Sequence, residues 1–216
     1  MKLLCVNVAQ PQEIEINGKL VLTGIYKQPV AGRVWLGKLN VAGDGQADLS
    51  VHGGEDQAAY AYPIEHFPHW QEYLGRAELP PGTFGENLTT RGLLEDAVCV
   101  GDILRVGDAV VQVTLPRLPC FKFAHKVGRP AIVKDFLHSG RSGFYLRVLT
   151  EGEIGAGDDI EVLERDAAGI SIRAVLGMQR LREGDLASLH RALAIPSLAP
   201  TLRQDLEKRL AAESGR

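Results

Sequence analysis

Short apolar or alternating runs recur over about the first 165 residues of the chain. Period-two alternation over such lengths predicts β-strands, and the intervening GDG, VGD and GAGDD segments predict turns. Many short strands without regularly alternating helices favour a barrel or a sandwich over βαβ units. The clearest runs are KLLCVNVA, EIEI, KLVLTGIY, GRVWLGKLNVAG, AVVQVTL, GFYLRVLTEGEI and DIEVLER.

Two helical segments are predicted within this β-rich region. The segment IEHFPHWQEY, residues 64–73, contains Pro68, which favours two short turns over one continuous helix. The segment AIVKDFLHS, residues 131–139, repeats its apolar residues at helical spacing. The predicted fold class is therefore mainly β with added α.

The pattern changes to helical spacing near residue 166. Asp185 is placed to cap a helix over 186–194. The last helix is marked by three leucines at i, i+4 and i+8, namely Leu202, Leu206 and Leu210. We predict a β domain over 1–165 and a three-helix domain over 166–216. About fifty residues bury little apolar surface on their own, so we expect the C-terminal helices to pack against the β domain.

Composition narrows the possible partners. The 216 residues are 45% hydrophobic and 24% charged, with a net charge of −3, which gives no electrostatic basis for nucleic-acid binding. No apolar run approaches the length of a membrane span, and the N-terminus lacks the long apolar region of a signal peptide. The three widely spaced cysteines fit no disulfide framework, so we expect a reducing, cytoplasmic compartment.

The cysteines differ in their surroundings. Cys5 and Cys99 are expected to be packed inside strands. Cys120 lies in PRLPCFKF, which is predicted to leave the preceding strand at its end because two prolines remove backbone donors. It is either a structural side chain at a strand end or a thiolate kept ionised by the nearby cations Arg117 and Lys122.

Two glycine-containing turns carry further polar groups. The segment VHGGEDQ has two interpretations. The turn near His52 can bring backbone N–H groups close to a phosphate, or it is an ordinary hairpin turn in which His52 is hydrogen-bonded within the protein. In TFGENLTT, Glu86 and Asn87 can recognise a heterocycle edge, or make local turns. Lys27, in GIYKQPV, is either a phosphate anchor or a solvated cation.

Taken together, GIYKQPVAGRV, VHGGEDQAAYAYP, TFGENLTTRGLLEDAVCVGD and PRLPCFKF resemble the MOSC family, the domain at the C-terminus of molybdenum-cofactor sulfurases, and within it the YiiM-like branch. The resemblance covers about residues 15–165, and the tail resembles the three-helix domain that follows MOSC in that branch. It implies a distorted β-barrel with short helices, which binds the molybdenum cofactor, a pterin dithiolene with a terminal phosphate.

The resemblance also implies roles for single residues. Cys120 matches the cysteine of the family's PCxK motif, the protein ligand to molybdenum. Lys27 matches a cofactor-contacting lysine, and His52, Asn87 and Arg117 are assigned to the cofactor pocket by position, with Lys122 beside them. Leu118 stands where relatives often have serine. Relatives often carry cations at the positions of Gly45 and Gln57, so two cationic anchors are absent here.

Related proteins reduce N-hydroxylated compounds, such as hydroxylaminopurines, amidoximes and hydroxamic acids, with electrons from a separate flavin or haem reductase. The chain has no flavin, nicotinamide or haem signature of its own, so it would need such a partner. The basic helical tail can dock that partner or simply be solvated. By residue type alone, His52, Asp56 and Glu86 can supply protons. The alternatives are a non-catalytic cofactor carrier and a metal-free thiol protein.

Overall fold

The computed structural model describes residues 1–47 and 53–214. In this part of the chain an eight-stranded sheet forms the centre of the molecule. Its strands pair antiparallel, except that β6 and β7 run parallel. In spatial order they are β12 (Ile160–Glu164), β8 (Ile103–Val106), β9 (Ala109–Pro116), β10 (Phe144–Thr150), β6 (Ala59–Pro63), β7 (Leu88–Arg91), β1 (Lys2–Val8) and β4 (Gln28–Pro29).

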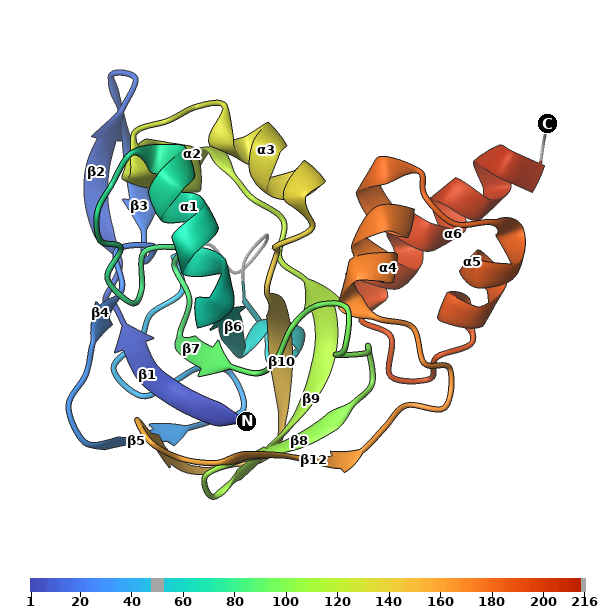
Figure 1. Cartoon of the computed structure of the whole chain (residues 1–216), viewed down its shortest axis with the longest axis horizontal. Coiled ribbons are helices and arrows are strands. Elements are labelled where there is room, and N and C mark those ends of the chain that lie inside the picture. Colours follow the sequence, from blue (N-terminus) through green and yellow to red (C-terminus); the bar gives the residue numbers. More distant parts are fainter. Residues whose placement is uncertain (48–52, 215–216) are drawn as a thin grey trace.

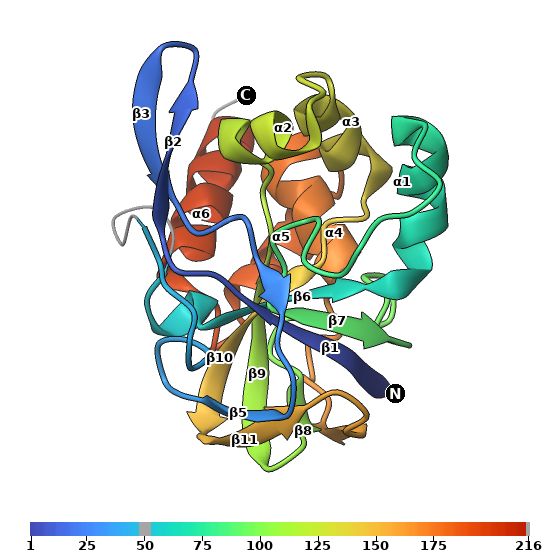
Figure 2. The ribbon, with the colours of Figure 1, turned by 90° about the vertical axis from the view of Figure 1, so that its left-hand side faces the viewer.

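Two smaller pairings complete the strands. β5 (Arg33–Leu36) pairs with β11 (Gly152–Gly155) at the lower edge of Figure 1. β2 (Gln12–Ile16) and β3 (Lys19–Thr23) form a hairpin that projects past the sheet, as Figure 2 shows. The mainly β prediction is thereby confirmed.

The sheet curls without closing into a complete barrel. β1 already pairs with β7 and β4, so only its first residues remain to meet β12. The start of β1 joins the segment leading into β12 through a bridge between Lys2 and Asp159. Main-chain hydrogen bonds run from the Leu3 amide to the Asp158 oxygen at 3.0 Å, from Gly157 to Leu3 at 2.8 Å and from Ile160 to Met1 at 3.0 Å. The expected barrel is therefore corrected, within the described residues, to a curled and incompletely closed sheet.

Three helices cover one end of the sheet. They are α1 (Phe67–Leu74), α2 (Phe121–Val127) and α3 (Ile132–Ser139). A 3₁₀ turn (Ile64–His66) leads into α1, and Pro68 lies in the first turn of that helix, where its missing N–H is tolerated. The predicted helix over 131–139 corresponds to α3, whereas α2 was not predicted.

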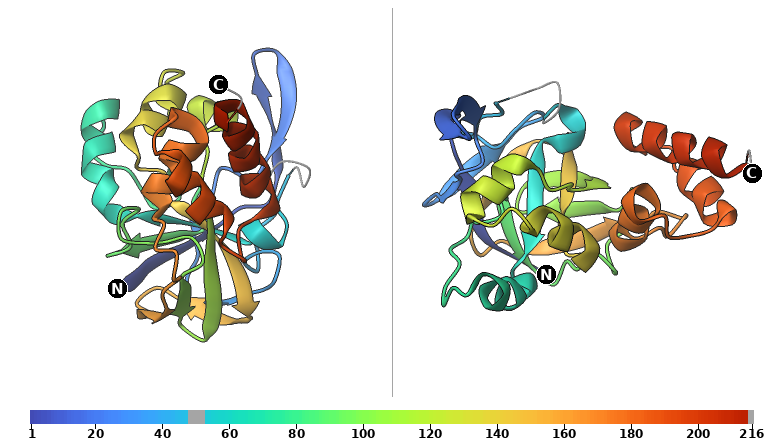
Figure 3. Two further views of the ribbon diagram at one scale, coloured as in Figure 1. Left: turned by 90° about the vertical axis from the view of Figure 1, so that its right-hand side faces the viewer. Right: turned by 90° about the horizontal axis from the view of Figure 1, so that it is seen from above.

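The C-terminal helices stand beside the β part, on the right of Figure 1, and the same separation is visible from above in Figure 3. They are α4 (Ile172–Leu176), a π-helical turn (Gly177–Leu181), α5 (Leu186–Leu193) and α6 (Pro200–Ser214). The Asp185 side chain accepts a hydrogen bond from the Ser188 amide, as its predicted capping role requires.

The tail shares a hydrophobic core with the sheet. Leu189, Leu202 and Leu206 of the tail belong to the same buried cluster as residues of β8, β9 and β10. A second cluster, rich in aromatic residues, lies under α1–α3 and includes Tyr62, Trp70, Phe84, Phe123 and Phe136. Cys5 lies in β1 as predicted, but Cys99 forms only an isolated bridge with Ser171 and is not inside a strand.

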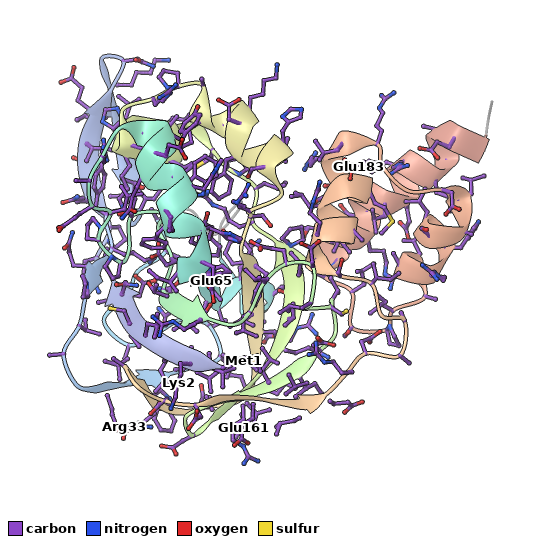
Figure 4. The ribbon with its side chains drawn as sticks, in the orientation of Figure 1. Met1, Lys2, Arg33, Glu65, Glu161 and Glu183 are labelled. Atoms are coloured by element: carbon purple, nitrogen blue, oxygen red, sulfur yellow. The ribbon has the colours of Figure 1, made fainter. Side chains whose placement is uncertain are left out.

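Charged residues gather at the edge of the sheet farthest from α1–α3. Figure 4 shows Lys2, Arg33 and Glu161 there, and Arg33 pairs with Asp108 and Asp158. In the described ranges no helix has both the length and the apolar character needed to cross a bilayer.

The shared core predicts coupled unfolding. Leu206→Ala should lower the free energy of unfolding by about 2–5 kcal/mol, because it opens a cavity at a fully buried position. Leu186→Ala, at a residue 42% exposed on α5, is the matched control. Tryptophan fluorescence reports the β part, since Trp35 and Trp70 both lie there, while circular dichroism also senses the tail helices.

In urea titrations of Leu206→Ala, both signals should shift together. A fluorescence transition that stays in place while the helical signal shifts would show that 166–216 unfolds independently.

Candidate functional site

A cavity of about 120 Å³ opens between β6, β10, α2 and the base of the β2–β3 hairpin. A single buried water needs only about 10–15 Å³, so the cavity has room for a larger ligand. The structure brings most of the predicted site residues to its wall: Lys27, Asn87, Arg117, Cys120 and Lys122. His52 lies outside the described residues.

Cys120 reaches the cavity because β9 stops at a proline. Pro116 is the last residue of β9, and the Arg117 amide makes a 3.4 Å contact with the Gly143 carbonyl oxygen as the strand ends. Cys120 then has extended backbone geometry and directly precedes α2. That helix ends at Gly128, which adopts the left-handed conformation with φ 75°. The half-buried thiol therefore sits at a strand-to-helix junction on the cavity wall.

Arg117 is the least compensated charge of the site. It is 5% exposed, and its guanidinium carbon lies 4.5 Å from the centre of the Phe123 ring and 5.3 Å from that of Phe136. Its Nη1 is buried without a hydrogen-bond partner, and no acidic side chain among the described residues forms an ion pair with it. Burying a cation without full compensation is costly, so this atom favours an anionic or oxygen-bearing ligand.

Lys27, in contrast, is neutralised within the protein. Its Nζ lies 2.5 and 2.6 Å from the two carboxylate oxygens of Asp44, and both side chains are buried. Burial lowers the pKa of Lys27, and the Asp44 carboxylate opposes that effect. Asp44 was not identified from the sequence, where it appeared only as part of a GDG turn.

Asn87 belongs to the same buried network. Its Nδ2 donates to Asp44 Oδ2 over 2.9 Å, and its Oδ1 accepts from the Tyr60 amide over 3.1 Å. The Asp44 carboxylate also accepts from the Ala9 amide at 2.8 Å. This network links β1, β6 and the loop before residue 48, so Asn87 and Lys27 shape the cavity as well as line it.

Glu86 organises the turn below the cavity. Its carboxylate accepts hydrogen bonds from the amides of Gly82 and Phe84, at 2.6 and 3.0 Å, and from the Thr89 hydroxyl at 3.0 Å. Burial raises the pKa of Glu86, and burial likewise lowers the pKa of the neighbouring Lys126 to about 8. These bonds give Glu86 a structural task, and it is not part of the cavity wall.

The remaining predicted groups are placed as follows. Asp56 pairs with Arg147 at a separate hollow beside the tail, away from Cys120. Gly45 and Gln57 line the cavity without adding charge, and Leu118 lines it without a hydroxyl group. A Cβ added at Gly45 would lie 2.3 Å from the Pro11 side chain, so a larger residue does not fit there without movement.

Lys122 connects the cavity wall to the hairpin, because its Nζ donates to the Leu22 carbonyl oxygen over 3.1 Å. Tyr145, on β10, completes the wall beside Cys120, although sequence reasoning did not select it. The one signal for it was its place in the alternating run GFYLRVLT.

Most of the tail cations considered for docking a partner are occupied locally. That set consists of Arg180, Arg182, Arg203, Lys208 and Arg209. Arg180 pairs with Asp205, Arg203 donates to main-chain oxygens of the tail, and Arg209 bonds Glu213 and neighbouring carbonyl groups. These contacts stabilise the tail itself, which leaves Arg182 and Lys208 as the remaining cations of that set.

The described residues contain no group of three or more histidine, cysteine, aspartate or glutamate side chains arranged to hold a metal ion. A metal bound by Cys120 would therefore need most of its ligands from a cofactor. The comparison of the sequence with known families matches the MOSC domain over residues 48–161. The chain belongs to the MOSC domain family.

Relatives of this MOSC protein extend over nearly its whole length. It is 42% identical to YflK of Bacillus subtilis, over 95% of this chain and 93% of that protein. The crystal structure of YiiM from Geobacillus stearothermophilus is 39% identical, with a TM-score of 0.82 and coverage of 97% of this chain and 98% of that one. The MOSC resemblance of the YiiM-like branch is thus confirmed.

A further relative bears a functional name. A protein of Gibberella moniliformis called "Reductase" is 37% identical over 83% of this chain, which corresponds to 32% of its own length. This chain thus spans about a third of that relative's length. Membership of the MOSC family indicates a function related to the molybdenum cofactor.

The buried ion pair yields a stability prediction. Asp44→Asn should lower the free energy of unfolding by about 3–5 kcal/mol at neutral pH, because it leaves the Lys27 ammonium buried without its counter-charge. The loss should shrink as the pH rises, since a lysine whose folded-state pKa is depressed loses its proton more readily in the folded protein.

Urea unfolding of the variant at about pH 7 and about pH 10 measures both effects. Asp159→Asn, which breaks the exposed pair with Lys2, is the control and should change little. An Asp44→Asn variant as stable as that control would contradict this role for the pair.

Proposed function

We propose that this MOSC protein is a molybdenum-cofactor enzyme that reduces N-hydroxylated compounds with electrons from a separate flavin or haem reductase. The observation that carries the proposal is the pairing, on one cavity wall, of the Cys120 thiol with the buried, incompletely bonded guanidinium of Arg117. A soft thiolate suits molybdenum, and a cation beside it suits the anionic groups of the cofactor.

The residues present fit this group. Cys120 would supply the protein ligand to the metal, and Arg117 Nη1 would donate to an oxygen or sulfur atom of the bound cofactor. Lys122 adds positive charge near the entrance, whereas the charge of Lys27 is largely offset by Asp44. Among the described residues, phosphate binding would therefore depend on Arg117, Lys122 and backbone groups such as the Gly53 amide, more than on Lys27.

The net reaction would be R–NHOH + 2 e⁻ + 2 H⁺ → R–NH₂ + H₂O. The N–O bond breaks, the nitrogen is reduced by two electrons from the reductase, and the oxygen leaves as water with protons drawn from solvent. When bound, the cofactor supplies a centre that exchanges two electrons and accepts an oxygen atom. The protein would bind and orient the substrate and keep the Cys120 sulfur ionised.

The decisive test uses protein produced in a host that makes the cofactor. Elemental analysis should find about one molybdenum per chain, and the protein should oxidise a reduced viologen dye when hydroxylaminopurine or benzamidoxime is added. Cys120→Ala should lose the metal and reduce turnover by more than about 100-fold, since loss of an outer-shell partner alone often costs about 10- to 100-fold.

Cys99→Ala is the matched control, because Cys99 does not line the cavity, and it should keep both metal and turnover. A Cys120→Ala variant with full molybdenum content and full turnover would contradict the proposal. Stable cofactor binding without dye oxidation would instead identify a cofactor carrier.

A further inference from the structure

Tyrosines from two paired strands meet beside the cavity. Tyr60 and Tyr62 lie on β6, and Tyr145 on β10 is the direct cross-strand partner of Tyr60. The hydroxyl of Tyr60 donates to the Ser142 carbonyl oxygen over 2.7 Å. The hydroxyl of Tyr62 donates to a main-chain oxygen as well, over 3.2 Å. Both of these phenol groups are therefore used to hold the fold.

Tyr145 differs from these two. Its side chain lines the same cavity as the Arg117 guanidinium, which can only donate hydrogen bonds. Among the described residues no hydrogen bond is formed to or from the Tyr145 hydroxyl, so its O–H has no acceptor in that part of the chain. A partly buried donor without an acceptor is unfavourable, and the cavity that Tyr145 lines is where an acceptor can enter.

The surroundings keep this phenol neutral. Burial raises the pKa of Tyr145, with Arg117 opposing the shift and negative charge at Cys120 adding to it. An ordinary tyrosine hydroxyl has a pKa of about 10 and so keeps its proton throughout the neutral range.

We propose that the Tyr145 hydroxyl, beside Arg117 on the cavity wall, donates a hydrogen bond to the oxygen of the substrate's N–OH group near Cys120. This inference rests on the proposed function and specifies how the same cavity recognises its substrate. The substrate carries the oxygen that the product lacks, so a donor aimed at that oxygen distinguishes the two. Because the donor is uncharged, it requires no charge on the ligand. It can therefore bind amidoximes, hydroxamic acids and hydroxylamines in the same way.

Binding without turnover tests the inference. Benzhydroxamic acid and benzamide differ only by the N-hydroxyl oxygen, and their dissociation constants can be measured by calorimetry on the molybdenum-loaded, oxidised protein without any reductant. The wild type should bind the hydroxamic acid more tightly. In Tyr145→Phe that preference should fall by about 2- to 10-fold, the usual range for one neutral hydrogen bond, while benzamide binding and molybdenum content stay unchanged.

Tyr73→Phe provides the matched control. Its hydroxyl bonds Asp135 on the outer helices, away from the cavity, so the preference should remain as in the wild type. Thermal unfolding of both variants reports whether each is folded. An unchanged preference in a folded, loaded Tyr145→Phe protein would overturn the role of Tyr145 alone. Absence of molybdenum from the wild type would instead overturn the proposed function.

Discussion

The guanidinium of Arg117 is buried among aromatic rings and lacks a hydrogen-bond partner at Nη1, and the chemistry of the site depends on this constraint. Pro116 ends β9, so the next residues must leave the sheet, and Arg117 turns inward where a ladder residue would have continued. The aromatic faces stabilise the cation in part. Arg117 Nη1 still requires a hydrogen-bond acceptor, and this residue lies at the cavity wall that also carries the Cys120 thiol.

Other charges near the cavity are balanced internally. Asp44 holds Lys27 and Asn87, and Glu86 collects main-chain amides of the turn before it. These contacts fix the loops that frame the cavity, and they leave those side chains little capacity for a ligand. The cavity thus combines a frame of hydrogen-bonded side chains with two groups that lack a full set of partners among the described residues, Arg117 Nη1 and the Tyr145 hydroxyl, on the wall that also carries Cys120.

The sequence carried much of this arrangement. Alternating runs marked most strands, Asp185 marked the start of α5, and the leucines at 202, 206 and 210 marked α6. Motif similarity selected cavity residues from four distant segments. The features that could not be predicted from the sequence depend on tertiary contacts. The helix α2 is short and follows two prolines, and Asp44 is important only because Lys27 is buried against it. Tyr145 has the same pattern as any other residue of an alternating strand. The predicted distorted barrel corresponds to a curled sheet that does not close fully, because β1 meets the β12 end of the sheet only through its first residues.

Anomalous diffraction at the molybdenum absorption edge, from crystals of protein made in a cofactor-competent host, tests the central claim most directly. We expect one molybdenum peak per chain, bonded to the Cys120 sulfur, with an atom of the cofactor within hydrogen-bond distance of Arg117 Nη1. A peak bound elsewhere, or a metal-free cavity in which Arg117 is fully paired with protein groups, would contradict it.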